Sequence, residues 1–580
     1  MLSPLQSPSP SSPPPPPLKI MMIGDSITHG REGDHTWRYR LFSWLSAQSI
    51  PSGFQFVGPY KGTVPPDTPH PPRPPQLINE PPPPPEPLLT TGGYAKSCSP
   101  SFLLNPDHFS ASGRQIYQAK SLIAEQVSAY QPDLCLVALG FNDLAWLRTS
   151  PSFTLGCMRE LVENARAVKS DVHFAVADVP HRSELPGQGD DNDLVLRTDI
   201  YNASLARAVE RWDRVQGSRV KLVKFCEGYS CGGSDSRGAY DGLHPNARGE
   251  WEIARAFSRT LVKGLGIGKE VLEMPGVIEE RELDIPKGFE AVSAPCGVVV
   301  KWEKVYGAYG YEVETLGRGV RYLAGNGLYE AGCEDGEVFS YRVRACYGDT
   351  VRSGWTEVVE AVARPETSPP PKDIRLWATE DGFEIELDRP EGEFARDIDR
   401  YGVVVYDYCL PGNWPRVYGI KGERGRIPGL DNGHRYGVSV RTWNKAGEGT
   451  PRGCEREVVI GRLGRVAVPQ GLKVRVLGAE GVQLIWPVDY NVGGYEVWGM
   501  NKGDGRQECL FKCPVDGYEC GKRTVNWLQP SLREWQFAIK AYNGSTDSDL
   551  SGWIGIPDQG ASSSSLSLNT TDSIDINIAH

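Results

Sequence analysis

The strongest constraint on the fold of this chain is a change of hydrophobic periodicity near residue 280. Before it, short apolar runs alternate with longer stretches whose apolar residues recur at helical spacing. After it, short runs of alternating apolar and polar residues are separated by Gly and Pro turns. A length of 580 residues also allows several domains. The sequence therefore predicts an α/β domain followed by all-β domains.

The first part, residues 18–267, predicts a parallel sheet with helices on both faces. The predicted strands are 18–23, 54–57, 134–139, 172–177 and 220–225. The predicted helices begin at Thr36 and cover 116–130, 155–169, 194–215 and 246–263. Because crossovers between parallel strands are right-handed, we expect the loops that follow these strands to meet at one edge of the sheet.

Three later segments share one pattern of short strands and predict three β-sandwiches at 284–364, 371–462 and 467–556. Each opens with a strand led by proline, continues with an apolar strand, and then has a strand that begins with tyrosine. The second strand ends with Trp302, Leu387 or Trp486, and the tyrosines are Tyr311, Tyr401 and Tyr495.

Two ends and one insertion do not fit either pattern. Residues 1–17 are rich in Ser and Pro, and residues 557–580 are rich in Ser and Thr, so both are predicted to be disordered. Residues 65–87 are dominated by proline, which favours an extended polyproline II conformation. We expect a tolerated surface insertion there; a flap over the active site and a partner-binding segment are the alternatives.

Four polar blocks follow predicted strands or turns of the first domain. They are Gly24-Asp25-Ser26, Ser112-Gly113-Arg114, Gly140-Phe141-Asn142-Asp143 and Asp241-Gly242-Leu243-His244-Pro245. Ser26 is a candidate nucleophile, which needs a base at neutral pH. His244 is the candidate base, and Asp241, three residues earlier, can hold its imidazole. Ser26, Asp241 and His244 are therefore the predicted catalytic residues.

In this order the four blocks resemble those of the GDSL or SGNH hydrolases, and are most similar to the carbohydrate-esterase branch of that family. The resemblance covers roughly residues 18–267 and implies a flavodoxin-like fold and a serine esterase. It also implies an oxyanion hole formed by the backbone N–H groups of Ser26 and Gly113 and the side chain of Asn142. The later segments resemble tandem fibronectin type III domains, although Leu387 and several cysteines depart from that pattern.

Each block taken alone has an ordinary structural explanation as a turn or a helix cap. Weaker candidates near the site, which a loop or core role explains equally well or better, are His29, His35, Asp107, His108, Trp37, Phe141 and Trp146. Trp498 is a similarly weak candidate for polysaccharide contact. No Cys/His metal pattern or dinucleotide glycine pattern stands out, so we expect neither a metal nor a cofactor.

Charge and cysteine content bear on partners and compartment. A net charge of −11 argues against nucleic-acid binding, and no apolar stretch is long enough to span a membrane. The start lacks the pattern of a signal peptide. A possible Cys226–Cys231 bridge and the glycosylation triplets at Asn202, Asn543 and Asn569 nevertheless favour an extracellular enzyme with an incomplete start; an intracellular enzyme remains the alternative.

The sequence thus predicts a serine esterase that hydrolyses short acyl esters, with acetyl groups on plant cell-wall polysaccharide as the implied substrate. The alternatives are a lysophospholipase or thioesterase, and an adhesion or binding protein in which the three sandwiches are the active part.

Overall fold

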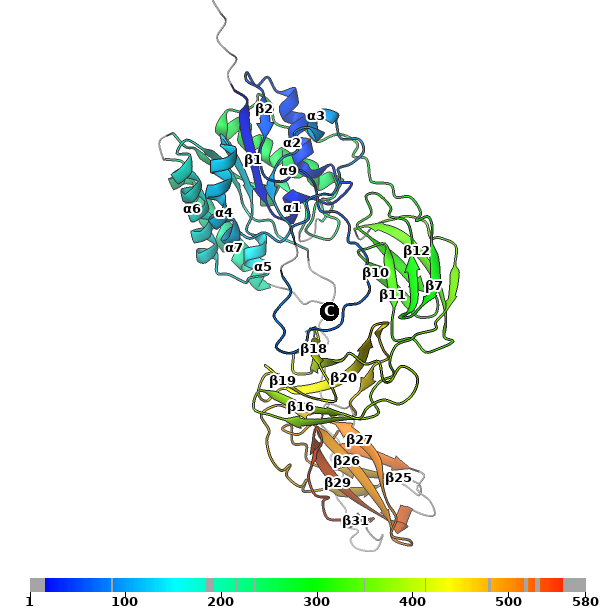
Figure 1. Ribbon diagram of the computed structural model, residues 1–580. Coiled ribbons are helices and arrows are strands. Elements are labelled where there is room, and N and C mark those ends of the chain that lie inside the picture. Colours follow the sequence, from blue (N-terminus) through cyan, green and yellow to red (C-terminus); the bar gives the residue numbers. More distant parts are fainter. Residues whose placement is uncertain are drawn as a thin grey trace, which may run out of the picture.

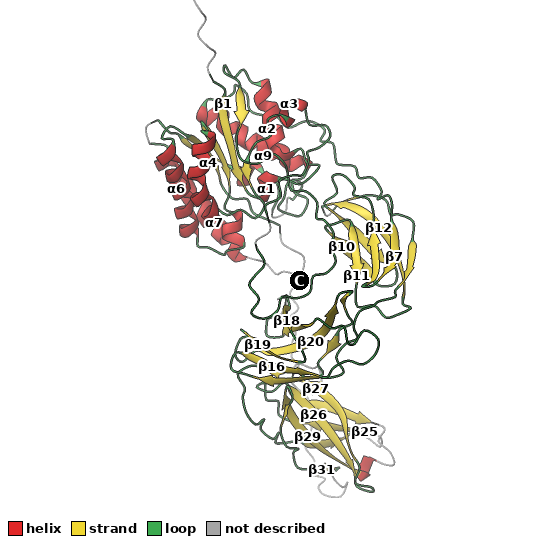
Figure 2. Cartoon of the chain, viewed as in Figure 1, coloured by secondary structure: helices red, strands yellow, loops and turns green. Residues whose placement is uncertain are grey.

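The computed structural model describes residues 16–556 except 85–86, 184–191, 215–216, 233–235, 349, 411, 413, 478–480, 516–519 and 527–531. Almost all of the predicted disordered ends, 1–17 and 557–580, lie outside these residues. An α/β domain stands at one end, and three β-sandwiches follow it in a curved row (Figures 1 and 2). The predicted fold class is confirmed.

The sheet of the α/β domain has the strand order β2-β1-β4-β5-β6, with the short β3 also paired to β1. Its strands are β1 (Leu18–Gly24), β2 (Phe54–Phe56), β3 (Phe109–Ser110), β4 (Leu134–Ala138), β5 (His173–Ala177) and β6 (Val220–Val223). Every pairing is parallel. This is the flavodoxin-like order, in which a ligand site lies where the order reverses.

Helices cover both faces of this sheet, as Figure 1 shows, and α2 packs against α9 while α4, α6 and α7 form the other layer. The helices are α1 (Ser26–His29), α2 (Thr36–Ala47), α3 (Pro100–Leu103), α4 (Ile116–Tyr130), α5 (Phe141–Ala145), α6 (Pro151–Val168), α7 (Asn192–Trp212), α8 (Phe225–Gly228), α9 (Ala247–Thr260) and a π-helical turn (Leu261–Leu265). Because both faces are covered, β4 is buried along its whole length.

The first sandwich, sandwich 1, has the sheets β11-β8-β7 and β10-β9-β12-β13, with β14 beside β12. Its strands are β7 (Glu290–Ala294), β8 (Gly297–Lys301), β9 (Gly310–Thr315), β10 (Gly319–Leu323), β11 (Gly327–Glu330), β12 (Val338–Tyr347), β13 (Val351–Arg352) and β14 (Val359–Val362). All of these pairings are antiparallel.

Sandwiches 2 and 3 repeat this arrangement, with the sheets β15-β16-β19 and β18-β17-β20-β21, then β24-β25-β28 and β27-β26-β29-β30. The strands of sandwich 2 are β15 (Ile374–Ala378), β16 (Gly382–Leu387), β17 (Arg400–Asp407), β18 (Arg416–Ile420), β19 (Arg424–Pro428), β20 (Arg435–Asn444), β21 (Gly447–Glu448), β22 (Arg452–Gly453) and β23 (Val458–Val459). Those of sandwich 3 are β24 (Lys473–Val476), β25 (Gly481–Ile485), β26 (Gly494–Asn501), β27 (Gln507–Pro514), β28 (Lys522–Asn526), β29 (Trp535–Asn543), β30 (Thr546–Asp547) and β31 (Ile554–Gly555).

One core position explains the departure noted at Leu387. Trp302, Leu387 and Trp486 are each 3% exposed in their own sandwich core. The two tryptophans meet their sandwich's tyrosine edge-on, with ring centroids 5.1 Å apart for Trp302–Tyr311 and 5.7 Å apart for Trp486–Tyr495. Leucine fills the same apolar position in sandwich 2, so the repeat keeps its core with a smaller side chain.

The proline-rich insertion forms a strap, which we define as residues 65–84, that reaches two sandwiches. Asp67 bridges to Gly325 of sandwich 1, and Leu77 bridges in parallel to Gly419 on the edge strand β18 of sandwich 2. There, the N–H of Gly419 donates to Gln76 O at 2.8 Å, and the N–H of Ile78 donates to Gly419 O at 3.0 Å. The strap is therefore docked along the molecule and is not an isolated surface insertion.

Replacing Gly419 by valine should release the strap from β18. A Cβ atom at this position would lie 2.6 Å from Gln76 O, closer than Cβ contacts normally come. We expect thermolysin to cut faster at Leu77 or Ile78 in Gly419→Val, followed by mass spectrometry. Val417→Ala, on the same strand at a position 54% exposed, is the control. Equal cleavage in Gly419→Val and the wild type would contradict this docking.

Three features that favoured an extracellular chain have defined contacts in the structure. Cys226 and Cys231 are free thiols, and the Cys231 thiol donates to His181 O at 2.9 Å, so the expected bridge is wrong. The Asn202 side chain both donates to and accepts from the backbone of Val179 at 2.8 Å. Asn543 is 4% exposed and holds the backbone of Val459. Asn569 lies outside the described residues.

Candidate active site

Ser26 begins α1 directly after β1. The Asp25 carboxylate caps this short helix by accepting the N–H of Ile27 at 3.0 Å. Gly24 permits the turn, because a Cβ atom there would lie 2.1 Å from Thr28 Oγ1. The chain thus turns sharply at the end of the strand and presents Ser26 at the carboxyl edge of the sheet.

The register of the sheet brings the other predicted blocks to the same edge. Gly24 pairs with Ser110 of β3 and with Ala138 of β4. The loop with Gly113 therefore leaves the sheet on one side of Ser26, and the loop with Asn142 leaves it on the other. Sequence reasoning missed β3, which is only two residues long, although it sets the position of the Gly113 loop.

Ser26, His244 and Asp241 form a continuous hydrogen-bonded row. His244 Nε2 lies 2.8 Å from Ser26 Oγ, and His244 Nδ1 lies 2.7 Å from Asp241 Oδ2. Asp241 Oδ1 also accepts the backbone N–H of His244 at 2.8 Å. With Asp241 ionised, Nδ1 carries the imidazole proton, so Nε2 is free to accept the proton of Ser26.

The Asp241 carboxyl is held in the ionised form by its neighbours. Burial acts to raise its pKa, but the hydrogen bond and charge of His244, together with two backbone N–H groups, outweigh burial and lower the pKa. A carboxylate that stays charged orients the ring and can stabilise an imidazolium.

The two predicted oxyanion donors of the later loops differ in their surroundings. Gly113 has φ +74°, and no heavy atom lies within 4 Å of where its Cβ would be, so its backbone is open to a ligand. Asn142 is 4% exposed, and its Nδ2 donates to Arg114 O at 3.1 Å. Asn142 is thereby tied to the Gly113 loop. The donor roles of Ser26, Gly113 and Asn142 stay predictions.

Buried basic residues fix the loops around Ser26. His29 Nδ1 accepts the N–H of Ser112 at 3.2 Å, next to Gly113. Burial, and then the charges of Arg38 and Arg114, lower the pKa of His29 to about 3, which keeps its ring neutral and able to accept. Arg38 is fully buried and donates to Thr28 O and His29 O, both at 2.9 Å. Sequence reasoning missed Arg38, since arginines on a helix are usually exposed.

Most of the weaker candidates are buried or bonded to neighbouring residues, which gives them a structural role. Trp37 is fully buried and stacks on Phe257 at 4.6 Å, and Phe141 is 3% exposed. His108 is fully buried, and its Nδ1 lies 2.7 Å from Ser110 Oγ. The indole of Trp498 donates to Glu496 in sandwich 3. Trp146 is 65% exposed beyond α5, so it alone among these aromatic side chains is largely open to solvent.

The Asp25 carboxyl should make stability fall as the pH rises. Burial raises its pKa to about 7 from 3.8. At pH values between 3.8 and about 7, the folded protein keeps a proton that the unfolded chain loses. The free energy of unfolding therefore falls by up to about 1.4 kcal/mol for each pH unit in this range. We expect Asp25→Asn to raise the thermal midpoint at pH 8 and to change it little at pH 4, as measured by calorimetry. Asp171→Asn, at an exposed carboxylate, should show no such gain, and equal effects of Asp25→Asn at both pH values would contradict this account.

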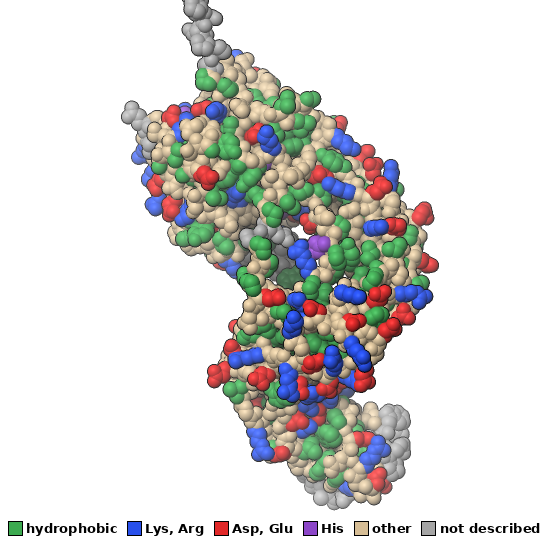
Figure 3. All heavy atoms as spheres, in the orientation of Figure 1, with side chains coloured by type: hydrophobic (Ala, Val, Ile, Leu, Met, Phe, Trp, Pro, Cys, Tyr) green, Lys and Arg blue, Asp and Glu red, His purple; other side chains and the backbone are tan. Residues whose placement is uncertain are grey.

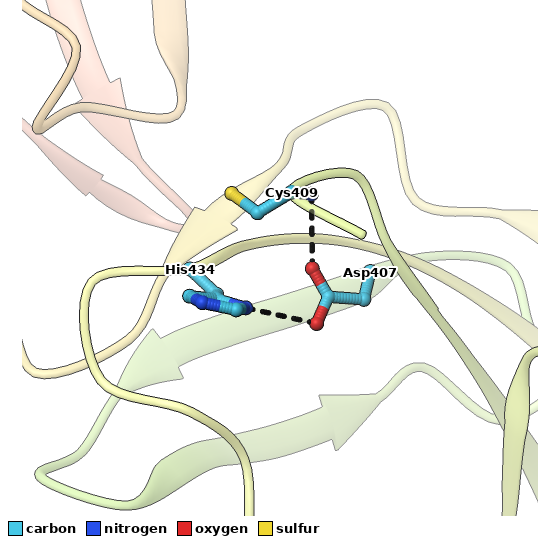
Figure 4. A group of neighbouring side chains, drawn as sticks. All are labelled: Asp407, Cys409 and His434. Atoms are coloured by element: carbon cyan, nitrogen blue, oxygen red, sulfur yellow. Dashed lines mark hydrogen bonds and ion pairs between the residues drawn. The ribbon is translucent and has the colours of Figure 1, made fainter. Parts of the chain in front are cut away.

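One group of side chains in sandwich 2 could converge on a metal ion, and it consists of Asp407, Cys409 and His434 (Figure 4). The ring of His434 bonds Asp407 Oδ2 at 3.0 Å, and the N–H of Cys409 donates to Asp407 Oδ1 at 2.9 Å. Through these bonds the Asp407 carboxylate caps the turn that contains Cys409. The group belongs to a different domain from Ser26 and takes no part in the candidate site.

Residues 92–251 match the model of the GDSL-like lipase/acylhydrolase family. No curated protein matches the chain. Within the described residues, no helix has the length and apolarity to cross a bilayer.

Among similar solved structures are an acetyl esterase mutant with acetate ion (20% identity, 42% of this chain, 97% of that chain, TM-score 0.31) and a family 3 carbohydrate esterase from Talaromyces cellulolyticus (22%, 42%, 97%, 0.31). Another is the chicken CNTN1 FN1–FN3 domains (14%, 48%, 99%, 0.17). The strand order β2-β1-β4-β5-β6 and its parallel pairing define the fold of the α/β domain. With the family match, the chain is a carboxylic ester hydrolase whose α/β domain resembles the GDSL-like acylhydrolases and is followed by three β-sandwiches.

Proposed function

We propose that this esterase works through an acyl-enzyme on Ser26. The observation that carries the proposal is the row Ser26–His244–Asp241, with contacts of 2.8 and 2.7 Å. His244 Nε2 takes the hydroxyl proton as Oγ attacks the ester carbonyl carbon. The resulting oxyanion is stabilised by the N–H groups of Ser26 and Gly113 and by Asn142 Nδ2.

The tetrahedral intermediate then collapses, the bond from carbon to the alcohol oxygen breaks, and His244 returns its proton to the leaving alcohol. In the second half, His244 takes a proton from water, whose oxygen attacks the acyl-enzyme. The carboxylic acid leaves as Ser26 Oγ recovers its proton from His244. These steps need no metal or cofactor, since the imidazole of His244 carries the proton in each of them.

We further propose short acyl groups, above all acetyl groups on cell-wall polysaccharide, as the substrate of an extracellular enzyme. The resemblance of the four sequence blocks to carbohydrate esterases supports this substrate. The open position at Gly113 supports access to the carbonyl. The end of the α/β domain that carries α1 and α5 faces the sandwiches in Figure 1, and Figure 3 shows a gap in the surface between this domain and sandwich 2.

Initial rates on acetylated xylan, on p-nitrophenyl esters of increasing acyl length, and on a lysophospholipid test this proposal. We expect turnover of acetyl esters that falls as the acyl chain lengthens, and release of acetate from xylan. Faster turnover of the lysophospholipid or of long acyl esters would replace the proposal by a lysophospholipase or thioesterase. The absence of any turnover would favour a binding protein.

A further inference from the structure

Tyr240, which directly precedes Asp241, links the candidate base to sandwich 1. Its ring stacks on the ring of His244, with centroids 5.6 Å apart and planes 18° apart. On other sides it meets Tyr309 at 4.7 Å and Tyr347 at 5.6 Å, both from sandwich 1. Tyr309 and Tyr347 also contact each other at 4.7 Å. We call Tyr240, Tyr309 and Tyr347 the tyrosine cluster.

Charged groups anchor sandwich 1 beside this cluster. Asp34, between α1 and α2, is 4% exposed and accepts from Arg281 Nη2 at 2.6 Å and from the Tyr309 hydroxyl at 2.5 Å. The Arg281 guanidinium also lies 4.1 Å from the ring centroid of Tyr347. Buried ion pairs of this kind are costly to break, because each leaves an unpaired charge. The anchor therefore fixes Tyr309 and Tyr347 relative to the α/β domain.

The two domains also approach each other backbone to backbone. A Cβ atom at Gly348 of sandwich 1 would lie 2.4 Å from Tyr240 Cβ, and a Cβ atom at Gly33 would lie 2.5 Å from Gly307 Cα of sandwich 1. Such contacts leave little freedom for sliding, since neither backbone can retreat without moving its whole strand or loop. A small displacement of sandwich 1 would therefore move Tyr240 as well.

We propose that sandwich 1 is a working part of the esterase, in which Tyr309 and Tyr347 press Tyr240 against His244 and so aim Nε2 at Ser26. The three tyrosines are positioning residues, because they act through His244. This inference rests on the proposed function, in which His244 is the base. It assigns sandwich 1 a role in turnover.

The test is Tyr347→Leu in the full chain, which removes the ring and keeps a smaller apolar side chain. We expect kcat for p-nitrophenyl acetate and the rate of Ser26 labelling by a fluorophosphonate probe to fall about tenfold or more, with KM nearly unchanged, because misaiming a base affects the chemical step. Tyr347→Phe keeps the ring and should recover most of both rates. Trp355→Leu, whose ring packs on Arg342 and Arg344 of the same sandwich, should leave both unchanged.

A folded Tyr347→Leu enzyme, with an unchanged thermal midpoint, that is labelled at the wild-type rate would overturn the inference. If Tyr347→Leu does not fold, Arg281→Met removes the ion pair with Asp34 and leaves the bond from the Tyr309 hydroxyl, and its labelling rate is judged in the same way. Failure of the wild-type chain to be labelled at Ser26 would instead refute the proposed function.

Discussion

Replacing His244 by alanine should lower kcat by about 10⁶-fold, the size of effect seen when a serine hydrolase loses its base. Among the described residues, His244 is the side chain that is hydrogen-bonded to Ser26 Oγ, and its loss leaves no such base to take the hydroxyl proton. Asp241→Asn should cost less, about 10⁴-fold, because the ring remains but its tautomer is no longer fixed. Initial rates with p-nitrophenyl acetate measure both effects.

His181→Ala is the matched control for this prediction. His181 also pairs with an aspartate, since its Nε2 lies 3.0 Å from Asp199 Oδ1. That pair lies outside the row that leads to Ser26, so we expect kcat within about twofold of the wild type. Activity above about one per cent in His244→Ala would reject His244 as the base. Full activity in Asp241→Asn would reject Asp241 as the carboxylate that orients the ring.

The second large effect is expected at Asn142. Asn142→Ala removes a side-chain donor beside the Gly113 loop, and loss of one oxyanion donor typically costs about 3–4 kcal/mol of transition-state stabilisation. We therefore expect kcat to fall roughly a hundredfold or more, with KM little changed, since the donor bonds the oxyanion more strongly than the ground-state carbonyl.

The control for Asn142 is Asn164→Ala. The Asn164 amide also donates to a backbone carbonyl, Lys120 O at 2.8 Å, but it lies on the exposed face of α6. Its loss should leave kcat unchanged. An Asn142→Ala enzyme with the wild-type kcat would remove Asn142 from the site.

The sequence predicted the parts of this structure that depend on local periodicity. The runs at 18–23 and 134–139 are apolar throughout because β1 and β4 are covered on both faces, and the structure has strands at Leu18–Gly24 and Leu134–Ala138. The juxtaposition of Ser26 with His244 followed from strand ends meeting at one edge. The repeat of short strands after residue 280 likewise predicted the sandwiches.

Features that depend on long-range contacts could not be predicted in this way. The docking of the strap on β18 depends on Gly419, whose role appears only once Gln76 lies against it. Arg38 looks like a solvated helix residue until Thr28 O and His29 O are brought to it. The tyrosine cluster brings Tyr240 against Tyr309 and Tyr347, which lie more than sixty positions later in the chain, and no local sequence pattern predicts such a contact.

The central claim is that the Ser26 hydroxyl is the nucleophile. Incubation of the full chain with a fluorophosphonate probe, followed by intact-mass and peptide mass spectrometry, tests it most directly. We predict one adduct, located on Ser26, which is absent in Ser26→Ala and strongly slowed in His244→Ala. An adduct on another residue, or ester hydrolysis that persists at the wild-type rate in Ser26→Ala, would contradict the claim.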